Sequence, residues 1–198
     1  NITGRLTAAQ TKMLRTKMQM IFQDPMASLN PREKVIDIIA QGLDVHHLYK
    51  DAAERRDKVY RMLERVGLSH EHANRYPHQF SGGQRQRIGI ARALALKPKL
   101  VICDEPVSAL DVSIQAQILN LLKDLQEELG LTFVFVTHDQ EEALTMSDRI
   151  VIMDKGEIQQ DDDPNTIYHY PKTKFVAGFI GESNFFDNGK ETVSYTHL

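Results

Sequence analysis

Two adjacent carboxylates, Asp104 and Glu105, directly follow a short apolar run, residues 100–103, that begins soon after Pro98. This run predicts a strand buried on both faces of a parallel sheet. Open parallel sheets bind ligands beyond the carboxyl ends of their strands, where these two acids lie. A carboxylate there can hold Mg²⁺, directly or through water, which suits Asp104, while Glu105 can orient or deprotonate an attacking water. The alternative is a strand that merely ends in an acidic turn.

A glycine pair, Gly82 and Gly83, lies between Ser81 and Gln84 just before a predicted helix over residues 85–95. Glycines at a helix start let the backbone approach a ligand closely, and the free N–H groups with the helix dipole favour an anion such as a phosphate. Alone, the pair also fits an ordinary loop. Its spacing before the acidic strand favours the phosphate interpretation.

His138 follows residues 133–136, an apolar run that predicts another buried strand. Its imidazole therefore also falls at the carboxyl end of a strand, where it could contact a γ-phosphate and hold the attacking water. His70 and His72 lie two positions apart, but no third ligand or supporting acid has suitable spacing, so we interpret them as solvated surface. The acidic run 161–163 is interpreted as a solvated turn rather than a metal site.

The elements that must position these residues alternate between strand and helix. A short strand is predicted over residues 19–22 after a polar, basic connection over 1–17. Between the two apolar strands, a stripe at helical spacing ends at Gly130, a usual helix stop. The stripe consists of Ile114, Ile118, Leu122, Leu125 and Leu129. Strand, crossover helix and strand form a parallel β-α-β unit, right-handed by default.

Two further regions complete the predicted organisation. Residues 32–79 are predicted to be helical, with Asp51 and Glu54 as a candidate capping box for a helix that ends near Gly67. A terminal hairpin is predicted over 150–160. Two peripheral segments, 164–169 and 174–180, follow it.

Taken together, these motifs resemble those of the ATP-binding cassette (ABC) ATPases. Residues 80–84 resemble the family's signature loop, 100–105 its Walker B strand and 108–111 its D-loop. His138 resembles the switch histidine, and Gln23, within Ile-Phe-Gln-Asp-Pro, resembles the Q-loop glutamine. The motif set is specific, and the resemblance extends over most of the chain, from Met18 to Phe186.

The resemblance implies an α/β fold of the P-loop NTPase (RecA-like) type, with a parallel sheet, helices on both faces and an inserted α-helical subdomain. The implied boundaries are 1–31 for a partial catalytic-core strand with the Q-loop, 32–79 for the helical subdomain, 80–180 for the RecA-like catalytic core and 181–198 for a disordered carboxyl-terminal tail.

The family's chemistry implies ATP and Mg²⁺ as cofactors, with two ATP molecules sandwiched between two subunits. Asp104 and Gln23 would serve Mg²⁺, and Glu105 and His138 the attacking water. Asp111 would communicate across the dimer. The loop formed by Ser81, Gly82, Gly83 and Gln84 would face the phosphate-binding loop of the second subunit. Phosphoryl transfer needs mainly positioning and charge stabilisation.

The partners implied are those of a bacterial importer. The ATPase subunit would bind transmembrane permease subunits peripherally at the cytoplasmic side of the membrane, and a periplasmic or extracellular solute-binding protein would act indirectly. In the family the helical subdomain docks on the permease. Met26 and Leu29 could contribute to docking, although apolar residues at such spacing are more often simple packing.

One family motif is missing. The chain contains no G-x-x-x-x-G-K-[ST], the Walker A loop that cradles phosphates and that the family carries upstream of the Q-loop. The chain also opens without Met. We therefore expect a fragment truncated at its amino end that binds nucleotide poorly or not at all.

The two halves of the chain resemble different importers. Residues 18 to about 129 look like the ATPase of an oligopeptide or dipeptide importer, whereas 136–186 look like that of a polyamine (spermidine/putrescine) importer. A recombined or misassembled sequence would explain this, and a natural mosaic stays open. Residues 193–198 resemble a translated sequencing adapter, so we expect a partly non-native tail; a disordered native terminus is the alternative.

Composition restricts the remaining classes. The 198 residues are 41% hydrophobic and 26% charged, as in a soluble globular domain, and the net charge of −3 gives no reason to expect nucleic-acid binding. The one cysteine, Cys103, lies in a predicted strand. No apolar run approaches the roughly 20 residues of a membrane span, and no secretory signal is visible. A soluble ABC ATPase of DNA repair or translation, and an inactive fragment that binds only partner subunits, remain as alternatives.

Overall fold

The computed structural model describes residues 4–181, 183–187 and 192–196, the last two ranges in their backbone only. Contacts divide the chain into two compact units, Asn1–Val136 and Thr137–Leu198. Each unit is described by itself.

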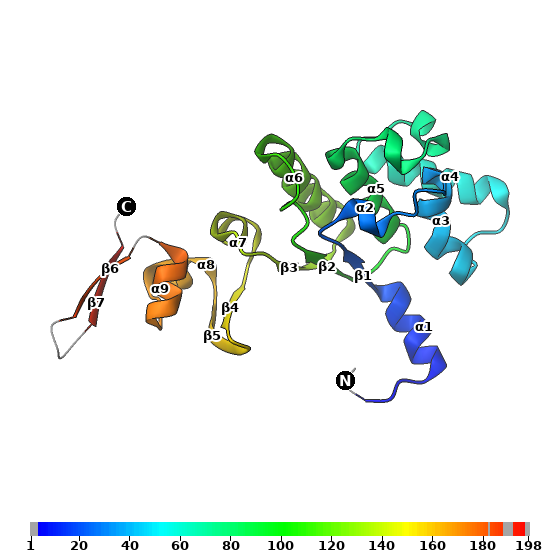
Figure 1. Ribbon diagram of the computed structural model, residues 1–198. Coiled ribbons are helices and arrows are strands. Elements are labelled where there is room, and N and C mark those ends of the chain that lie inside the picture. The colour runs from blue at the N-terminus through cyan, green and yellow to red at the C-terminus, as the bar shows by residue number, and fades with distance from the viewer. Residues whose placement is uncertain (1–3, 182, 188–191, 197–198) are drawn as a thin grey trace. The chain divides into compact units, whose positions relative to one another are not determined.

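A three-stranded parallel sheet lies in the first unit (Figure 1). β2 (Leu100–Asp104) is the central strand, between β1 (Met18–Ile21) and β3 (Thr132–Val136). The carboxyl ends of the strands therefore meet at one edge, because Ile21 pairs with Cys103 and Asp104 pairs with Val136. The predicted strands and their parallel arrangement are confirmed.

Burial alternates along these strands. Val101 and Cys103 are 0% exposed and join the helical core, whereas Val134 and Val136 are 46% and 48% exposed. The prediction of strands buried on both faces is therefore wrong for residues 100–103 and 133–136. The reason is that the described helices pack closely against the side of the sheet that carries Val101 and Cys103.

The first helix, α1 (Ala8–Lys17), was not predicted. It begins at a capping box in which the Thr7 hydroxyl accepts from the Gln10 N–H and the Gln10 side chain accepts from the Thr7 N–H. No residue of α1 is buried, so no apolar stripe marks it in the sequence. Its helix-favouring Ala, Leu, Lys and Arg residues are the local signal that identifies it.

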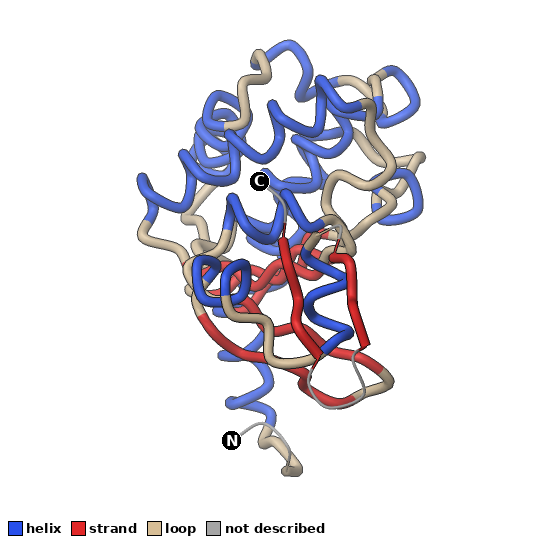
Figure 2. The backbone as a smooth tube through the Cα atoms, turned by 90° about the vertical axis from the view of Figure 1, so that its left-hand side faces the viewer, coloured by secondary structure: helices blue, strands red, loops and turns tan. Residues whose placement is uncertain are grey.

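Residues 32–79 contain helices and no strand, as predicted (Figure 2). The main elements are α3 (Val35–His46) and α4 (Ala52–Arg65), preceded by the short α2 (Pro25–Ser28) and followed by two 3₁₀ helices, His70–Asn74 and Pro77–Gln79. The Asp51 carboxylate caps α4 by accepting from the Glu54 N–H at 2.8 Å. The Glu54 carboxylate accepts from the Lys50 N–H instead of the Asp51 N–H, so the predicted capping box is only half formed.

Two long helices flank β2 in the chain: α5 (Gly82–Leu94) leads from the helical region to β2, and α6 (Val112–Leu129) connects β2 with β3. α5 starts earlier than predicted and includes the glycine pair in its first turn. α6 carries the predicted stripe, with Ile118, Leu122 and Leu125 buried. It ends at Gly130, whose φ of 61° is the left-handed conformation that glycine adopts readily.

The second unit has a small core of its own. The predicted hairpin is formed by β4 (Ile150–Asp154) and β5 (Glu157–Asp162), which pair antiparallel. α7 (Gln140–Met146) precedes it, and α8 (Pro164–His169) and α9 (Lys174–Ile180) follow. The buried core residues are Ile150, Ile152, Ile167, Val176 and Ile180.

Two short strands lie in the carboxyl-terminal tail. β6 (Ser183–Asp187) and β7 (Thr192–Thr196) form an antiparallel pair. Positions 182, 188–191, 197 and 198 lie outside the described residues. Within the described part of the chain, none of the helices has the length and apolarity that a bilayer span requires.

Candidate functional site

Asp104 and Glu105 lie at the carboxyl end of the central strand. Asp104 is the last residue of β2, and the Glu105 N–H donates to the Val136 carbonyl at the end of β3, at 2.8 Å. Glu105 has a φ of 42°, a left-handed conformation that is uncommon for a residue with a side chain. The chain therefore turns sharply after β2, and such conformations often occur at functional sites.

The Gln23 side chain reaches Glu105 across 82 positions of sequence. Its Nε2 donates to Glu105 Oε2 at 2.7 Å and to Ser108 Oγ at 3.2 Å. Ser108 is tied to the same turn, since its hydroxyl donates to the Glu105 carbonyl at 3.1 Å. The parallel pairing of β1 with β2 explains the meeting, because both chain segments leave the sheet at one edge.

Asp104 and Gln23 line one cavity of about 430 Å³, together with Phe22, Asp24, Ala27 and Ser28. Carboxylate and amide oxygens are ligands that Mg²⁺ accepts, and Mg²⁺ usually keeps several waters or phosphate oxygens as well. The described residues contain no group of three or more His, Cys, Asp or Glu side chains that could hold a metal ion. The donors thus fit an ion that takes most of its ligands from elsewhere.

The glycine pair lies at the start of α5, where Ser81 and Gln84 form a capping box. The Ser81 hydroxyl accepts from the Gln84 N–H at 3.3 Å, and the Gln84 side chain accepts from the Ser81 N–H at 3.0 Å. A Cβ on Gly83 would lie 2.5 Å from Cγ2 of Ile114, and one on Gly82 would lie 3.2 Å from Leu110. Packing against the start of α6 therefore requires glycine at position 83, a reason that the sequence did not reveal.

Asp111 and His138 are two further residues that the sequence predicted for the site. Asp111 is exposed at the N-cap of α6, where its side chain makes no capping hydrogen bond. His138 is exposed and belongs to the second unit, so its convergence with Asp104 and Glu105 stays a prediction. Asp139, next to it, caps α7 by accepting from the Glu141 N–H at 2.8 Å.

The acidic run 161–163 makes structural contacts. Asp161 pairs with Arg149 and Asp162 with Lys172, and these contacts lower the pKa of both carboxyls. Asp163 caps α8 through the Thr166 N–H.

The two neighbouring histidines have separate partners. His70 stacks on Tyr60 with ring centroids 4.2 Å apart, and His72 meets the ring of Phe80 at 5.3 Å. His70 Nε2 also lies 2.7 Å from Oε1 of Glu64, and among the described residues neither histidine belongs to a group of three or more metal-ligating side chains.

One buried and one half-buried group, Cys103 and Arg92, are not among the predicted site residues. Burial raises the pKa of the Cys103 thiol, which directly precedes Asp104, so this cysteine is no nucleophile. Arg92, near the end of α5, donates to the carbonyl of Ser28 at the end of α2. α5 carries three arginines, Arg85, Arg87 and Arg92, and the sequence does not indicate which of them contacts Ser28, so only the structure reveals this contact.

Comparisons with a family model and with individual known proteins point to the same family. Residues 2–108 match the family model described as "ABC transporter". The oligopeptide transport ATP-binding protein OppF of Bacillus subtilis (strain 168) is 56% identical over 180 residues, which cover 91% of this chain and 59% of that protein. The dipeptide transport ATP-binding protein DppF of Lactococcus lactis subsp. cremoris (strain MG1363) is 52% identical over 175 residues, 88% of this chain and 56% of that protein.

A solved structure is also similar. The cbiO1 protein from Clostridium perfringens, described as part of the ABC transporter complex cbiONQ, superposes with a TM-score of 0.73 at 28% identity, covering 84% of this chain and 64% of that one. The chain spans 59% of the length of the OppF relative. An alignment of 180 residues necessarily extends past Leu129, into residues 136–186, whose motifs predict a polyamine importer.

Proposed function

The chain belongs to the ABC transporter family, and from this premise we propose that it forms part of the ATP-binding subunit of an oligopeptide or dipeptide importer. The observation that carries the proposal is the hydrogen-bonded group of Gln23, Glu105 and Ser108 at the carboxyl edge of the parallel sheet. In this class of sheet, that edge is where ligands bind.

Each residue of the edge has a proposed role. The Glu105 carboxylate accepts a proton from, or orients, the water that attacks the terminal phosphate. Asp104 and the amide oxygen of Gln23 would hold Mg²⁺, which when bound neutralises charge on the phosphates. The Gln23 Nε2 fixes one oxygen of Glu105 at 2.7 Å, which orients the carboxylate. His138 would hold the same water from the second unit.

The start of α5 is proposed to serve a second copy of the subunit. The N–H groups of its first turn and the positive end of its dipole favour a phosphate, and Ser81 is exposed there. Asp111, exposed at the start of α6, would contact the second copy. ATP would thus lie between two subunits.

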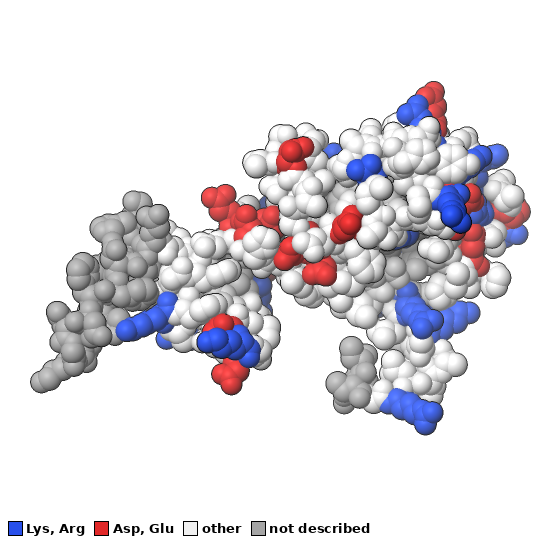
Figure 3. All heavy atoms as spheres, viewed as in Figure 1, with Lys and Arg blue, Asp and Glu red and all other residues white. Residues whose placement is uncertain are grey.

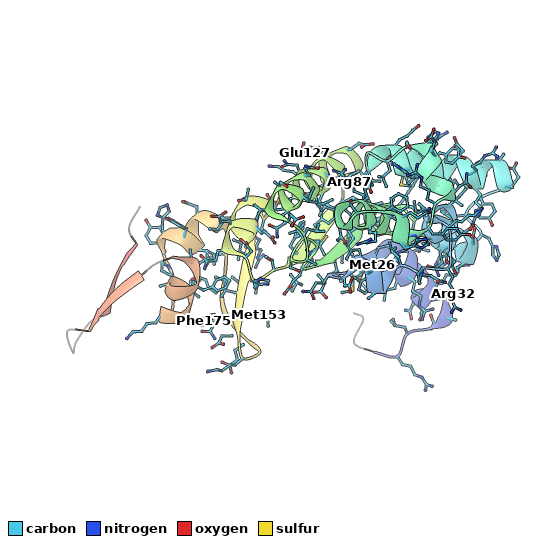
Figure 4. All side chains as sticks on the ribbon, turned by 45° about the horizontal axis from the view of Figure 1, so that its top comes forward. Met26, Arg32, Arg87, Glu127, Met153 and Phe175 are labelled. Atoms are coloured by element: carbon cyan, nitrogen blue, oxygen red, sulfur yellow. The ribbon has the colours of Figure 1, made fainter. Side chains whose placement is uncertain are left out.

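The proposed membrane partner is a permease, contacted at the cytoplasmic side of the membrane, with a solute-binding protein acting indirectly. Met26 on α2, labelled in Figure 4, is 46% exposed and can contribute to this contact. Leu29, the other residue considered for docking, is 2% exposed and belongs to the core. Charges of both signs are interspersed over the face of the first unit seen in Figure 3, which supports a protein partner rather than a nucleic acid.

Peptides are the preferred solute class, because relatives at 52% and 56% identity carry oligopeptide and dipeptide transport in their names. A polyamine importer is the alternative suggested by residues 136–186. The chain itself would contact neither solute, since solute binding belongs to the permease and the solute-binding protein.

A chimera tests the proposal. The chain replaces the matching 180 residues of the B. subtilis OppF protein in cells that lack their own copy, and uptake of a labelled oligopeptide is measured. We expect uptake to be restored, and Glu105→Gln to lower it by roughly 100-fold or more, because general-base groups contribute on that scale.

The matched control is Glu127→Gln, an exposed carboxylate on α6 that is labelled in Figure 4. This variant should keep full uptake. A folded, membrane-associated chimera without uptake, or one in which Glu105→Gln is harmless, would contradict the proposal.

A further inference from the structure

Arg92 is a half-buried cation whose partner is a neutral carbonyl. Its guanidinium donates to the Ser28 carbonyl, which lies 64 positions earlier in the chain. Burial lowers the pKa of Arg92, and among the described residues no carboxylate pairs with it. Arg55 shows the usual arrangement by contrast, since it contacts both Asp37 at 3.1 Å and Asp44 at 2.7 Å.

Fold stability alone does not explain this placement. Taking a cation out of water is unfavourable, and one neutral acceptor offsets that loss only in part. Arg92 is only half-buried, whereas Ala91, Ala93 and Leu94 on the other faces of α5 are buried and apolar, so the core of α5 is formed without it. We therefore consider which segment the contact between Arg92 and the Ser28 carbonyl holds in place.

The segment that receives the hydrogen bond, residues 22–28, exposes most of its residues. Phe22 and Met26 are 45% and 46% exposed, and α2 is a helix of only four residues whose cap, Asp24, belongs to the same segment. Pro25 is its only buried member. Gln23 holds the first half of the segment to Glu105, and Arg92 holds its last residue to α5.

α5 is fixed at its other end as well. Gly82 and Gly83 pack against Leu110 and Ile114, next to the turn that contains Glu105 and Ser108. A helix of 13 residues is about 20 Å long and bends little over that length. One rigid helix thus contacts both chain segments that meet at Glu105.

We propose that Arg92 is a positioning residue, which acts through the Ser28 carbonyl to set where residues 22–28 place the Gln23 amide against Glu105. The effect of Arg92 on the position of residues 22–28 is inferred from the hydrogen bonds that Arg92 and Gln23 make. Its catalytic consequence rests on the proposed function, so the two are tested separately.

The structural part is tested in the chain itself with a fluorescent reporter. The sequence contains no tryptophan, so Met26→Trp, at an exposed position of α2, gives a single-tryptophan protein. In this background Arg92→Gln is expected to lower the fluorescence anisotropy of the indole and to raise its quenching by acrylamide. Arg92→Lys, which keeps the positive charge and N–H donors on a long side chain, should give values between those of the parent and Arg92→Gln.

Arg87→Gln is the matched control. Arg87 lies on the same helix and is also half-buried. It also donates to a backbone carbonyl, but to that of Val66, at 2.7 Å, and not to one in residues 22–28. Both substitutions should lower the urea midpoint measured by circular dichroism, whereas only Arg92→Gln should change the indole signal. An unchanged anisotropy in Arg92→Gln, or an equal loss in Arg87→Gln, overturns the inference. Should Arg92→Gln fail to fold, Arg92→Lys gives the same comparison.

The catalytic part is tested in the chimera described above. Arg92→Gln is expected to lower kcat for ATP hydrolysis about tenfold, a factor equivalent to about 1.4 kcal/mol, with KM for ATP unchanged. Arg87→Gln should leave kcat at the parent value. A parent chimera without ATPase activity counts against the proposed function, whereas an active parent with an unaffected Arg92→Gln variant counts against positioning.

Discussion

Gly83 shows how one residue can be fixed by a neighbour in the same chain. A Cβ at this position would lie 2.5 Å from Cγ2 of Ile114, a distance at which either the Ile114 side chain or one of the two helices must move. We therefore predict that Gly83→Ala lowers the free energy of unfolding by roughly 1–3 kcal/mol, as overpacked cores do. Urea unfolding followed by circular dichroism measures this change.

The same helix provides the control. A Cβ on Gly89 would meet nothing within 4 Å, so Gly89→Ala should stabilise the chain by about 0.5–1 kcal/mol through helix propensity. The clash itself is tested in an Ile114→Ala background, where Gly83→Ala should be milder by roughly 1 kcal/mol. An equal loss in both backgrounds would show that the Ile114 contact is not the cause.

Cys103 provides a second prediction for a single residue. Its side chain is 0% exposed and its thiol pKa is raised by burial, so the reactive thiolate is scarce in the folded chain. Labelling by a thiol reagent should therefore follow the unfolding transition in urea. Rapid labelling in native buffer would refute this. In the control, Cys103→Ala combined with Val112→Cys, the thiol moves to a position that is 81% exposed and should react at once.

The ion pair between α3 and α4 makes the helical region sensitive to acid. Arg55 donates to both oxygens of Asp44 at 2.7 Å, and this contact is the main reason that the pKa of Asp44 lies below its ordinary value of 3.8. A carboxyl whose pKa is lower in the folded state stabilises the fold above the unfolded pKa and loses that effect as the pH falls through the folded pKa.

Asp44→Asn should therefore lower the free energy of unfolding by about 1 kcal/mol at pH 7, a value discounted for the partial exposure of the pair. The difference from the parent should shrink as the pH falls below 3.8. Urea unfolding at pH 7 and at a pH below 3.8 measures this difference in the free energy of unfolding. Asp57→Asn, which breaks the exposed pair with Arg61, should change little at either pH, and a pH-independent effect of Asp44→Asn would contradict the mechanism.

At the scale of elements, the spacing of apolar residues predicts helices that bury one face and misses a helix that buries none. The stripe of α6 and the buried Val59, Met62 and Leu63 of α4 are visible as spacing, because those helices bury one face. α1 buries no residue and was missed. Apolar strands were predicted to be buried on both faces, but Val134 and Val136 show that an apolar run does not reveal how many layers cover it.

The site was predictable where its residues end strands. Asp104, Glu105 and Gln23 follow apolar runs, and parallel pairing brings their positions to one edge. Spacing cannot reveal that Gly83 packs on Ile114 or that Arg92 reaches Ser28, because both contacts depend on how α5 lies against its neighbours.

At the scale of the whole molecule, the edge strand β3 leads us to expect self-association at high concentration. It lies at one edge of the described sheet, and Val134 and Val136 are nearly half exposed. Exposed apolar edge strands pair with other chains, and lysine on the strand prevents this. Val134→Lys should reduce self-association in sedimentation experiments. Val112→Lys, on a helix, should not, and an equal effect of both would indicate a simple change in net charge.

Glu105 keeps its backbone in a conformation, φ 42°, that glycine adopts more easily than any residue with a Cβ. Laboratory evolution scored on heat resistance alone would therefore favour glycine at this position and discard the carboxylate. Thermal stability favours glycine at position 105, whereas ATP hydrolysis favours the glutamate. A screen for more stable variants must therefore also score transport.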